Sequence, residues 1–555
     1  MKKYLLLLFI LLGVCISNFA IANEMQVVAE KKIKVAISND DYTSIEHKEI
    51  NISATSDWQI YDTKQEKVLG KGKAGQELKF IIKHGFFDIY AGEKELTYML
   101  SGPLVISVKD NGFIKLLDIK RKNKDALYRG QIVLEKVKSK IDKFYIINEI
   151  DLEDYLYGVV PNEMPVRFGL EALKAQAVAA RNYVLRPRSK AQNDQYDVTD
   201  SVSSQVYFGA NTEEPLATRA VDETRNIIAT YQCEPILALY HSTSGGITEN
   251  YENAFNRPGT KIFPANPLPY LKAVKDNVDD NFLEIEDDAI HYYKGSPNTF
   301  ENSSPYFRWS KTWDKKELEE ILTKTLNKYM NSGFVSQMMP FVTRVGDLKE
   351  IKVLKRGKSG KIVRLSIVDA NNVFFAEREL IIRQLFLKEN KILPSANVIF
   401  EHNLDENGNL VSITAYGGGY GHGVGMSQYG AGYLAQAGKD FEYILKHYYT
   451  DIDLTTIPIK LDTDKKNTKI QSFYFNHKNA KLIVENMKPA NNINLKINNG
   501  ENIKLKFANT NQQVLIYELA PYLLKGQNTI QVQNVEDCNL RNEIKFYIEF
   551  SNEDE

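Results

Sequence analysis

The residue best suited to acid–base chemistry is Glu163, in the segment Gly158-Val-Val-Pro-Asn-Glu-Met-Pro165. Two prolines fix backbone φ angles here, so the sequence predicts a stiff loop that holds the carboxyl group in place. The neighbouring side chains are apolar: Val159, Val160, Met164 and Phe168. Such surroundings favour a protonated carboxylic acid, which can give its proton to a leaving oxygen. The alternative is an ordinary solvated glutamate.

Two basic residues follow Glu163 on the strongest predicted helix, from about Gly169 to Arg186. Lys174 and Arg181 are seven residues apart and therefore lie on one helix face. They are candidates to bind an anionic or hydroxyl-rich ligand. A solvated helix face is the alternative interpretation.

Two further clusters carry hydrogen-bonding groups. His241, Ser242 and Ser244 follow a predicted strand over Ile236–Leu239, and no GxSxG elbow marks a serine nucleophile. We interpret them as groups for a polar ligand. The second cluster is the glycine-rich stretch 417–425 around His422, followed by Gln428. Glycines permit positive φ angles and close approach of a ligand to backbone amides. In both cases a purely structural turn is the alternative.

Other chemistries are disfavoured. The string Gly357-Lys-Ser-Gly360 lacks the earlier glycine that a phosphate-binding P-loop needs. None of the eight histidines forms an HExxH or HxxxH pair, and no cysteine has metal-ligand spacing, so the sequence predicts no metal and no cofactor. With 70 basic and 71 acidic residues, the chain has no overall positive field for nucleic acid.

The surrounding pattern predicts an α+β protein. Short strands separated by turns dominate the amino-terminal region, and a Lys/Asn-rich alternating pattern near the carboxyl terminus predicts a small β-sandwich. Between them, further helices are expected at Asp314–Tyr329, Ser427–Ala437 and Phe441–Tyr448, and a strand pair at 351–354 and 362–368. Four parts result: a signal peptide (1–22), a β-rich region (23–127), a mixed α/β core with a central Ala-rich helix (128–455) and an accessory β-sandwich (456–555).

The first 22 residues combine Lys2 and Lys3, an apolar run and a small-x-small ending at Ala20-Ile-Ala22, which predicts export to the periplasm, cell envelope or exterior. An uncleaved anchor and lipid attachment at Cys15 are alternatives. The remaining cysteines, Cys233 and Cys538, are expected to be buried apolar groups rather than a disulfide framework.

Several motifs in one order resemble the SpoIID/LytB family. The resemblance covers about residues 128–452 and rests on the strings YLYGVVPNEMP, EALKAQAVAARNYVL, DSVSSQVYFG, YHSTSGGITEN, FRWSKTWDKKEL and GGGYGHGVGMSQYGA. It implies a lytic transglycosylase that acts on peptidoglycan glycan strands, especially strands without stem peptides, with Glu163 as the catalytic residue. The motif positions that imply substrate contacts are Lys174, Arg181, Gln205, Tyr207, His241, Ser242, Ser244, His422 and Gln428.

The resemblance has one departure and one functional alternative. Some relatives bind zinc in the segment that here reads Asp197-Val-Thr-Asp-Ser-Val-Ser-Ser-Gln-Val-Tyr207, but Thr199, Ser203 and Ser204 are poor zinc ligands, so no metal is expected. LytB-type relatives are described as modifiers of a cell-wall amidase. A glycan-binding protein that assists such an amidase without cutting glycan is therefore the alternative function, and a structural envelope protein is a third.

Overall fold

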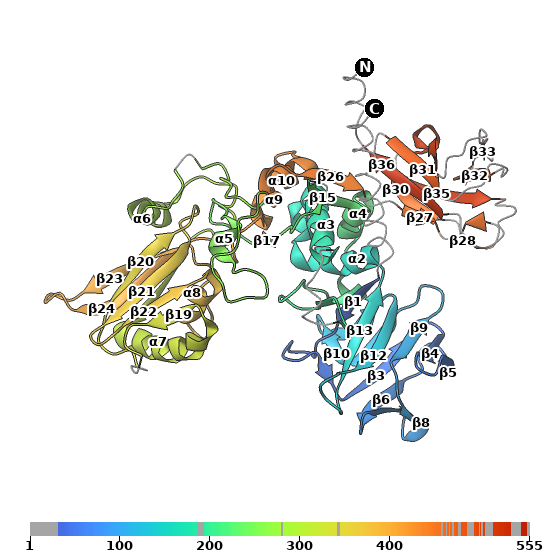
Figure 1. Ribbon diagram of the computed structural model, residues 1–555, viewed down its shortest axis with the longest axis horizontal. Helices are drawn as coiled ribbons and strands as arrows, with labels where there is room; N and C mark the ends of the chain where they lie inside the picture. The colour runs from blue at the N-terminus through green and yellow to red at the C-terminus, as the bar shows by residue number, and fades with distance from the viewer. Residues whose placement is uncertain are drawn as a thin grey trace, which may run out of the picture. The chain divides into compact units, whose positions relative to one another are not determined.

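The computed structural model describes residues 32–185, 194–232, 234–278, 281–340 and 344–456. Towards the carboxyl terminus it describes 459–461, 463–464, 467–468, 471–475, 479–485, 493–498, 500, 503–505, 514–524, 526–533 and 545–551. The chain divides into two compact units (Figure 1). Unit 1 comprises residues up to Val166, Gln176–Ile236 and the chain from Leu454. Unit 2 comprises Arg167–Ala175 and Leu237–Asp453.

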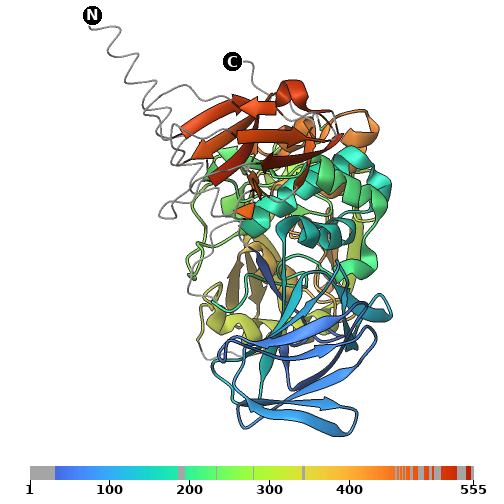
Figure 2. The same cartoon turned by 90° about the vertical axis from the view of Figure 1, so that its right-hand side faces the viewer.

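The amino-terminal part of unit 1 consists of two antiparallel-rich sheets, drawn in blue and cyan in Figure 2. The first has the order β14 (Val198–Thr199), β1 (Ile33–Ala36), β13 (Phe144–Ile150), β12 (Gln131–Lys136), β9 (Leu104–Val108), β4 (Trp58–Asp62) and β5 (Lys67–Gly72), with β2 (Glu46–His47) on β13. The second has the order β11 (Lys124–Tyr128), β10 (Ile114–Arg121), β3 (Glu49–Ala54), β6 (Leu78–Lys83), β7 (Phe86–Ala91) and β8 (Lys94–Leu100).

Buried aromatic and β-branched side chains join the two sheets. Phe87 of β7 meets Phe144 of β13 with ring centroids 5.4 Å apart, and both rings are fully buried. Burial of such side chains is the main stabilising term of a small β-structure. The first sheet also contains strands from both sides of the predicted boundary at residue 127. β12 and β13, which follow the boundary, pair with β9 and β1, which precede it.

Helices of unit 1 follow these sheets in the chain. They are α2 (Leu152–Glu163), the part of α3 (Leu170–Leu185) from Gln176, and α4 (Pro215–Glu223). A small sheet of β16 (Glu234–Pro235), β15 (Ile227–Tyr231) and β26 (Asp453–Thr456) accompanies them. The alanines of α3 are fully buried, as expected for a central helix that other backbones approach closely.

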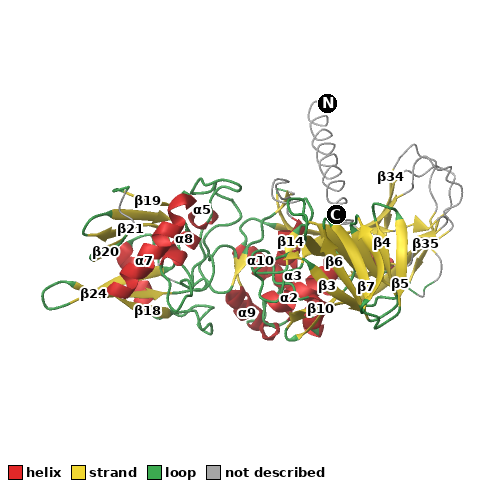
Figure 3. Cartoon of the chain, turned by 90° about the horizontal axis from the view of Figure 1, so that it is seen from below, coloured by secondary structure: helices red, strands yellow, loops and turns green. Residues whose placement is uncertain are grey.

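Unit 2 is built around two antiparallel sheets. One has the order β19 (Val335–Gln337), β22 (Val373–Glu377), β21 (Ile362–Asp369) and β20 (Leu348–Arg356), and the other β18 (Trp309–Asp314), β24 (Leu410–Gly417) and β23 (Val398–Leu404). Helices α7 (Lys315–Tyr329) and α8 (Glu379–Leu385) lie beside each other against these strands (Figure 3). Leu318, Leu322 and Leu326 recur along one face of α7 and belong to the buried core.

The rest of unit 2 carries the predicted polar clusters. A short parallel pair joins β17 (Tyr240–His241) to β25 (Met426–Ser427), which leads directly into α9 (Gln428–Gln436). The other helices are α5 (Tyr251–Ala254), α6 (Glu286–Lys294) and α10 (Phe441–Tyr448). Ser427 and Asp440 cap α9 and α10 by accepting hydrogen bonds from Gly430 and Tyr443.

The carboxyl-terminal strands form two four-stranded antiparallel sheets and a short pair of β28 (Thr463–Asp464) and β29 (Asn467–Thr468). One has the order β27 (Ile459–Leu461), β36 (Lys545–Ser551), β31 (Asn479–Glu485) and β34 (Val514–Glu518). The other has β30 (Gln471–Phe475), β35 (Gly526–Gln533), β32 (Ile493–Ile497) and β33 (Ile503–Leu505). Leu482, Val484, Leu495 and Ile530 are buried, as alternating strands of a two-layer module require.

The α+β class is confirmed, and most predicted elements are present. The predicted signal peptide and all three cysteines lie outside the described residues. Two local predictions are wrong. Residues 236–239 are not a strand, since β17 begins only at Tyr240, and the segment around Glu163 is helical rather than a loop. No helix in the described ranges combines the length and apolar character needed to cross a bilayer.

Candidate functional site

Glu163 is the last residue of α2, a helix that contains Pro161 in its final turn. The predicted loop is wrong because a proline near a helix end removes only one backbone hydrogen bond, and here the helix ends two residues later. Asn162 supports this turn by donating from Nδ2 to the carbonyl oxygen of Gly158 at 2.7 Å. The side chain of Glu163 therefore leaves a rigid helix end.

The carboxylate of Glu163 is half-buried and held by a backbone donor. The N–H of Val206 donates to Oε1 at 2.6 Å. Val159, Val160 and Met164 are fully buried, and the apolar surroundings of the carboxyl group stay a prediction. The carboxyl end of a helix disfavours an adjacent negative charge, whereas an N–H donor stabilises it.

Gly158 lets the segment with Val206 approach α2. A Cβ at Gly158 would lie 2.6 Å from Cε2 of Tyr207 and 2.9 Å from the carbonyl oxygen of Gly209. No real Cβ tolerates such contacts, so any other residue would push this segment away from the helix. The glycine therefore contributes to the position of the donor that holds Glu163.

The side chains of Gln205 and Tyr207 point into the core of unit 1. Gln205 is fully buried, accepts from the hydroxyl of Tyr155 at 3.1 Å and donates to the carbonyl of Ala180 at 3.3 Å. Tyr207 is 1% exposed and donates to Oδ1 of Asn148 at 2.8 Å. Burial raises the pKa of Tyr207 well above its usual value. In this arrangement both residues position the Val206 N–H, and neither presents a side chain to a ligand.

Arg181 is fully buried in an ion pair with Glu153 of α2. Its Nε lies 2.9 Å from Oε1 and an Nη 2.6 Å from Oε2, while the other Nη donates to the carbonyl of Ile227 at 2.9 Å. Bidentate contacts of this kind are strong and directional. They link α3 to α2, the helix that ends at Glu163, and give Arg181 a structural role in this conformation.

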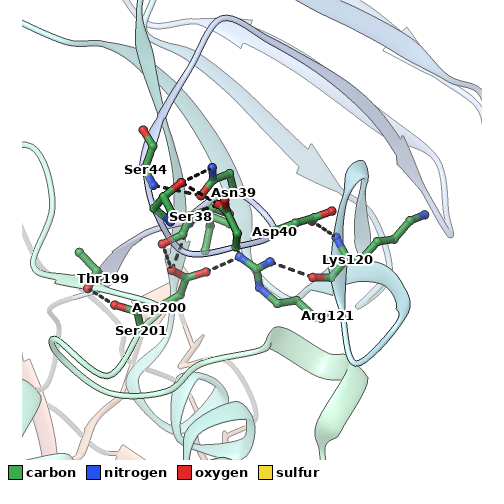
Figure 4. Close-up of polar contacts among 12 residues, drawn as sticks. Ser38, Asn39, Asp40, Ser44, Lys120, Arg121, Thr199, Asp200 and Ser201 are labelled. Carbon is green, nitrogen blue, oxygen red and sulfur yellow. Dashed lines mark hydrogen bonds and ion pairs between the residues drawn. The ribbon is translucent and has the colours of Figure 1, made fainter. Parts of the chain in front are cut away.

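Asp200 ties the segment 197–207, where no metal is predicted, to the amino-terminal strands (Figure 4). Its carboxylate accepts from the backbone and hydroxyl of Ser38 and pairs with Arg121 at 2.6 Å. Beside it, the hydroxyls of Thr199, Ser201 and Ser203 bond to one another. Across the part of the chain that the structure describes, no three His, Cys, Asp or Glu side chains are grouped as metal ligands would be. This carboxylate instead fixes the fold, and the absence of a metal stays a prediction.

Lys174 belongs to unit 2, since the division between the units falls within α3. Its side chain is only 9% exposed and its Nζ lies 2.7 Å from Oε1 of Glu171. The ammonium group also lies 5.9 Å from the ring centre of Phe441. Lys174 thus has an anionic partner on its own helix, and the two predicted basic residues of α3 belong to different units.

In unit 2 the structure brings together the two predicted polar clusters. Thr243 and Tyr420 exchange backbone hydrogen bonds of 3.3 and 2.8 Å, and His241 and His422 lie with ring centroids 5.6 Å apart. Ser242 accepts at its carbonyl from the N–H of Tyr429, next to Gln428 at the start of α9. His241, Ser244 and Gln428 are buried, and Ser242 and His422 are half-buried.

The glycine-rich stretch has the predicted backbone conformation. Gly419 and Gly421 have φ angles of 89° and 104°, and a Cβ at Gly419 would lie 2.7 Å from the carbonyl oxygen of Thr243. Glycine is therefore required both by conformation and by the close approach of two backbones. In the described structure, the stretch serves to hold the two clusters together.

Glu301, which the sequence did not indicate, holds the backbone of the cluster that contains Ser244. It is fully buried, and its carboxylate accepts from the N–H groups of Ser244 at 2.7 Å, Gly245 at 2.7 Å and Gly246 at 2.8 Å, and from the hydroxyl of Ser427. Burial, and then the Asp276 carboxylate, raise the pKa of Glu301 to about 7, against the lowering effect of the hydroxyl of Ser427. A lone glutamate in a polar loop carries no sequence signal of this role.

A second missed carboxylate, Glu249, explains the Gly357-Lys-Ser-Gly360 turn. Its oxygens accept from the N–H groups of Lys358 and Ser359 at 3.0 Å and from the hydroxyl of Ser359 at 2.6 Å. The turn thus presents its backbone donors to an anion, as a phosphate loop does, but the anion is a side chain of the same unit.

Burial weakens the basicity of three side chains near the glycine-rich stretch. Burial lowers the pKa of His241 well below its usual value, that of His422 to about 4, and that of Lys361. Within the described residues, Nε2 of His241 and Nζ of Lys361 have no hydrogen-bond partner. Lys361 was not among the predicted residues, because an isolated lysine at the start of a strand is usually solvated.

Comparisons with known proteins agree with the motifs. Residues 140–231 match the family model described as SpoIID, stage II sporulation protein, and residues 258–425 match a domain of unknown function, DUF8618. The chain is 30% identical over 329 residues to stage II sporulation protein D of Bacillus amyloliquefaciens, which covers 56% of this chain and 75% of that relative. The corresponding protein of Bacillus subtilis is 30% identical over 318 residues, covering 55% and 74%. An amidase enhancer of Bacillus subtilis is 28% identical over 311 residues, covering 54% and 40%.

Proposed function

Since this chain belongs to the SpoIID/LytB family, we propose that it is a peptidoglycan lytic transglycosylase with Glu163 as its acid and base. The observation that carries the proposal is the setting of Glu163, a half-buried carboxylate at a rigid helix end with the Val206 N–H at 2.6 Å. The family and the similarity to an amidase enhancer support a role related to the cell wall.

In the proposed reaction, Glu163 first protonates the oxygen of the β-1,4 bond between N-acetylmuramic acid and N-acetylglucosamine. The bond between that oxygen and C1 of the muramyl unit breaks, and the sugar left behind carries positive charge at C1. The Glu163 carboxylate then takes the proton of the C6 hydroxyl as its oxygen bonds to C1. The product is a 1,6-anhydro sugar, and one carboxyl group serves both steps because no water attacks.

The other motif residues of unit 1 have a positioning role in this proposal. Gln205 and Tyr207 hold the backbone that donates to Glu163, and Arg181 fixes α2 through Glu153. Ser242 and His422 of unit 2, which are half-buried, are proposed to hydrogen-bond the glycan. The proposal includes export, which the first 22 residues predict.

Glu163→Gln tests the proposal. The amide cannot transfer a proton, so release of anhydromuramyl sugars from glycan strands without stem peptides should fall by at least about a hundredfold. Glu214→Gln is the matched control, because Glu214 is exposed in the same unit and caps no backbone group with its side chain. Products measured by mass spectrometry at equal rates from wild type and Glu163→Gln would contradict the assignment.

The similarity to an amidase enhancer supports a second candidate, a glycan-binding protein that assists a cell-wall amidase. This function predicts intact strands with retained binding for the wild type, and faster release of stem peptides when an amidase is added. Strand cleavage that is lost in Glu163→Gln would exclude it as the sole function.

A further inference from the structure

Unit 2 contains a pocket that none of the residues discussed for Glu163 lines. It has a volume of about 520 Å³ and is formed by two tyrosines, four basic residues and a short apolar segment. Its lining residues are Tyr306, Lys311, Arg383, Lys388, Lys391, Ile392, Leu393, Pro394 and Tyr420. The volume falls within the range of small-molecule sites.

The charge of this pocket is positive and only partly neutralised. Arg383 lies 3.0 Å from Glu379, and Lys388 lies 2.9 Å from both carboxylate oxygens of Glu317. Lys311 and Lys391 have no ion pair with any residue that the structure describes, and no acidic residue lines the pocket. Two ammonium groups are thus available to an anion.

The two tyrosines give the pocket an aromatic wall. Their ring centroids lie 4.3 Å apart, and Tyr306 and Tyr420 are 39% and 43% exposed. Backbone hydrogen bonds fix this wall, since Gly419 donates to the carbonyl of Tyr306 at 2.8 Å and Gly421 to that of Pro394 at 3.0 Å. Exposed aromatic faces on a rigid backbone offer apolar surface to a ring-shaped ligand at low entropic cost.

We propose that this pocket binds an acidic saccharide, with a sugar ring against Tyr306 and Tyr420 and its carboxylate at Lys311 and Lys391. The apolar faces of a sugar ring pair with the tyrosines, and a carboxylate is the anion that such lysines stabilise. The muramyl unit, with its lactyl carboxylate, has this chemistry. Naming that unit rests on the proposed function, whereas the residues that line the pocket belong to unit 2 and Glu163 belongs to unit 1.

Binding of defined saccharides to the full chain tests the proposal. Calorimetry would compare a muramyl-containing tetrasaccharide with the neutral N-acetylglucosamine tetrasaccharide, using Glu163→Gln as the parent to prevent cleavage. Replacing Lys311 and Lys391 by Gln should weaken binding of the muramyl ligand by about tenfold and leave the neutral ligand unchanged. Tyr420→Ala should weaken both. Replacing Lys352 and Lys355 by Gln removes two exposed charges from β20, outside the pocket, and should change neither.

The outcomes separate this inference from the proposed function. Unchanged binding of the muramyl ligand in the Lys311 and Lys391 variant would overturn the inference, even if wild type cleaves glycan. A tenfold loss would support it, even if wild type cleaves nothing. Binding of poly(glycerol phosphate) at the same lysines, without binding of the muramyl ligand, would overturn the assignment to an acidic saccharide.

Discussion

Glu163, which lies in a motif, and Glu301, which lies outside the motifs, are carboxylates in opposite settings. Glu163 in unit 1 is half-buried, with the Val206 N–H on one oxygen, whereas Glu301 in unit 2 is fully buried and accepts from three backbone N–H groups and a hydroxyl. A carboxylate surrounded by donors has its oxygens committed to the fold. The exposed fraction of a carboxyl group therefore separates one available for chemistry from one that stabilises a loop better than its sequence context does.

The largest expected effect on stability is at Arg181, which the comparison assigns to the fold. Arg181→Met leaves Glu153 buried without its cation and should lower the free energy of unfolding by about 3–5 kcal/mol, measured by urea denaturation. Arg219→Met is the matched control, because the Arg219 side chain in its ion pair with Glu223 is 61% exposed and should contribute less than about 1 kcal/mol. Unchanged stability together with weaker glycan binding would instead support the substrate contact that the sequence predicted.

Replacing each carboxylate, Glu301 and Glu163, by Gln should change stability by different amounts. Glu301→Gln turns an NH₂ group towards backbone donors and should destabilise unit 2 by about 2–4 kcal/mol. Amide hydrogen exchange of Ser244, Gly245 and Gly246 should accelerate, because their N–H groups lose their acceptors. Glu163→Gln should change the stability of unit 1 by less than about 1 kcal/mol. Similar destabilisation by both substitutions would break the distinction.

A smaller effect concerns pH. The folded state holds His422 neutral, with a pKa of about 4 against 6.5, so the stability it contributes is present above pH 6.5 and is lost as pH falls towards 4. Glu301 acts in the opposite sense. Its pKa of about 7 means that the folded state keeps a proton that the unfolded chain releases, so stability falls as pH rises from 4.5 to 7.

In the wild type, the opposite pH dependences of His422 and Glu301 should largely cancel. His422→Gln removes the first and should reveal the second. In that variant, unit 2 should become less stable by about 2 kcal/mol between about pH 5 and about pH 7, as measured by urea denaturation. This change in the free energy of unfolding is smaller than the full pKa shift of Glu301 would give, because four donors stabilise the Glu301 anion. A variant whose stability rises with pH over this range would show that Glu301 is ionised in the folded state.

The sequence predicted elements better than it predicted contacts. Periodicity located α7, which buries one face, and α3, which is buried on nearly all sides. Pro161 suggested a loop at Glu163, since local propensity does not show that the turn is stabilised by Asn162 and by the close approach at Gly158. Arg181, Gln205 and Tyr207 were predicted as substrate contacts from their motif positions. The sequence did not indicate their burial, because it depends on partners far along the chain.

In the proposed reaction, Glu163 drives cleavage by the strand's own C6 hydroxyl and not by water. The most direct measurement is mass spectrometry of the products formed by the wild type from glycan strands without stem peptides, in water labelled with heavy oxygen. We expect the wild type to form terminal muramyl units that are lighter by one water than reducing ends and carry no label. Glu163→Gln should form none of these products. Reducing muramyl ends that carry the label would contradict it.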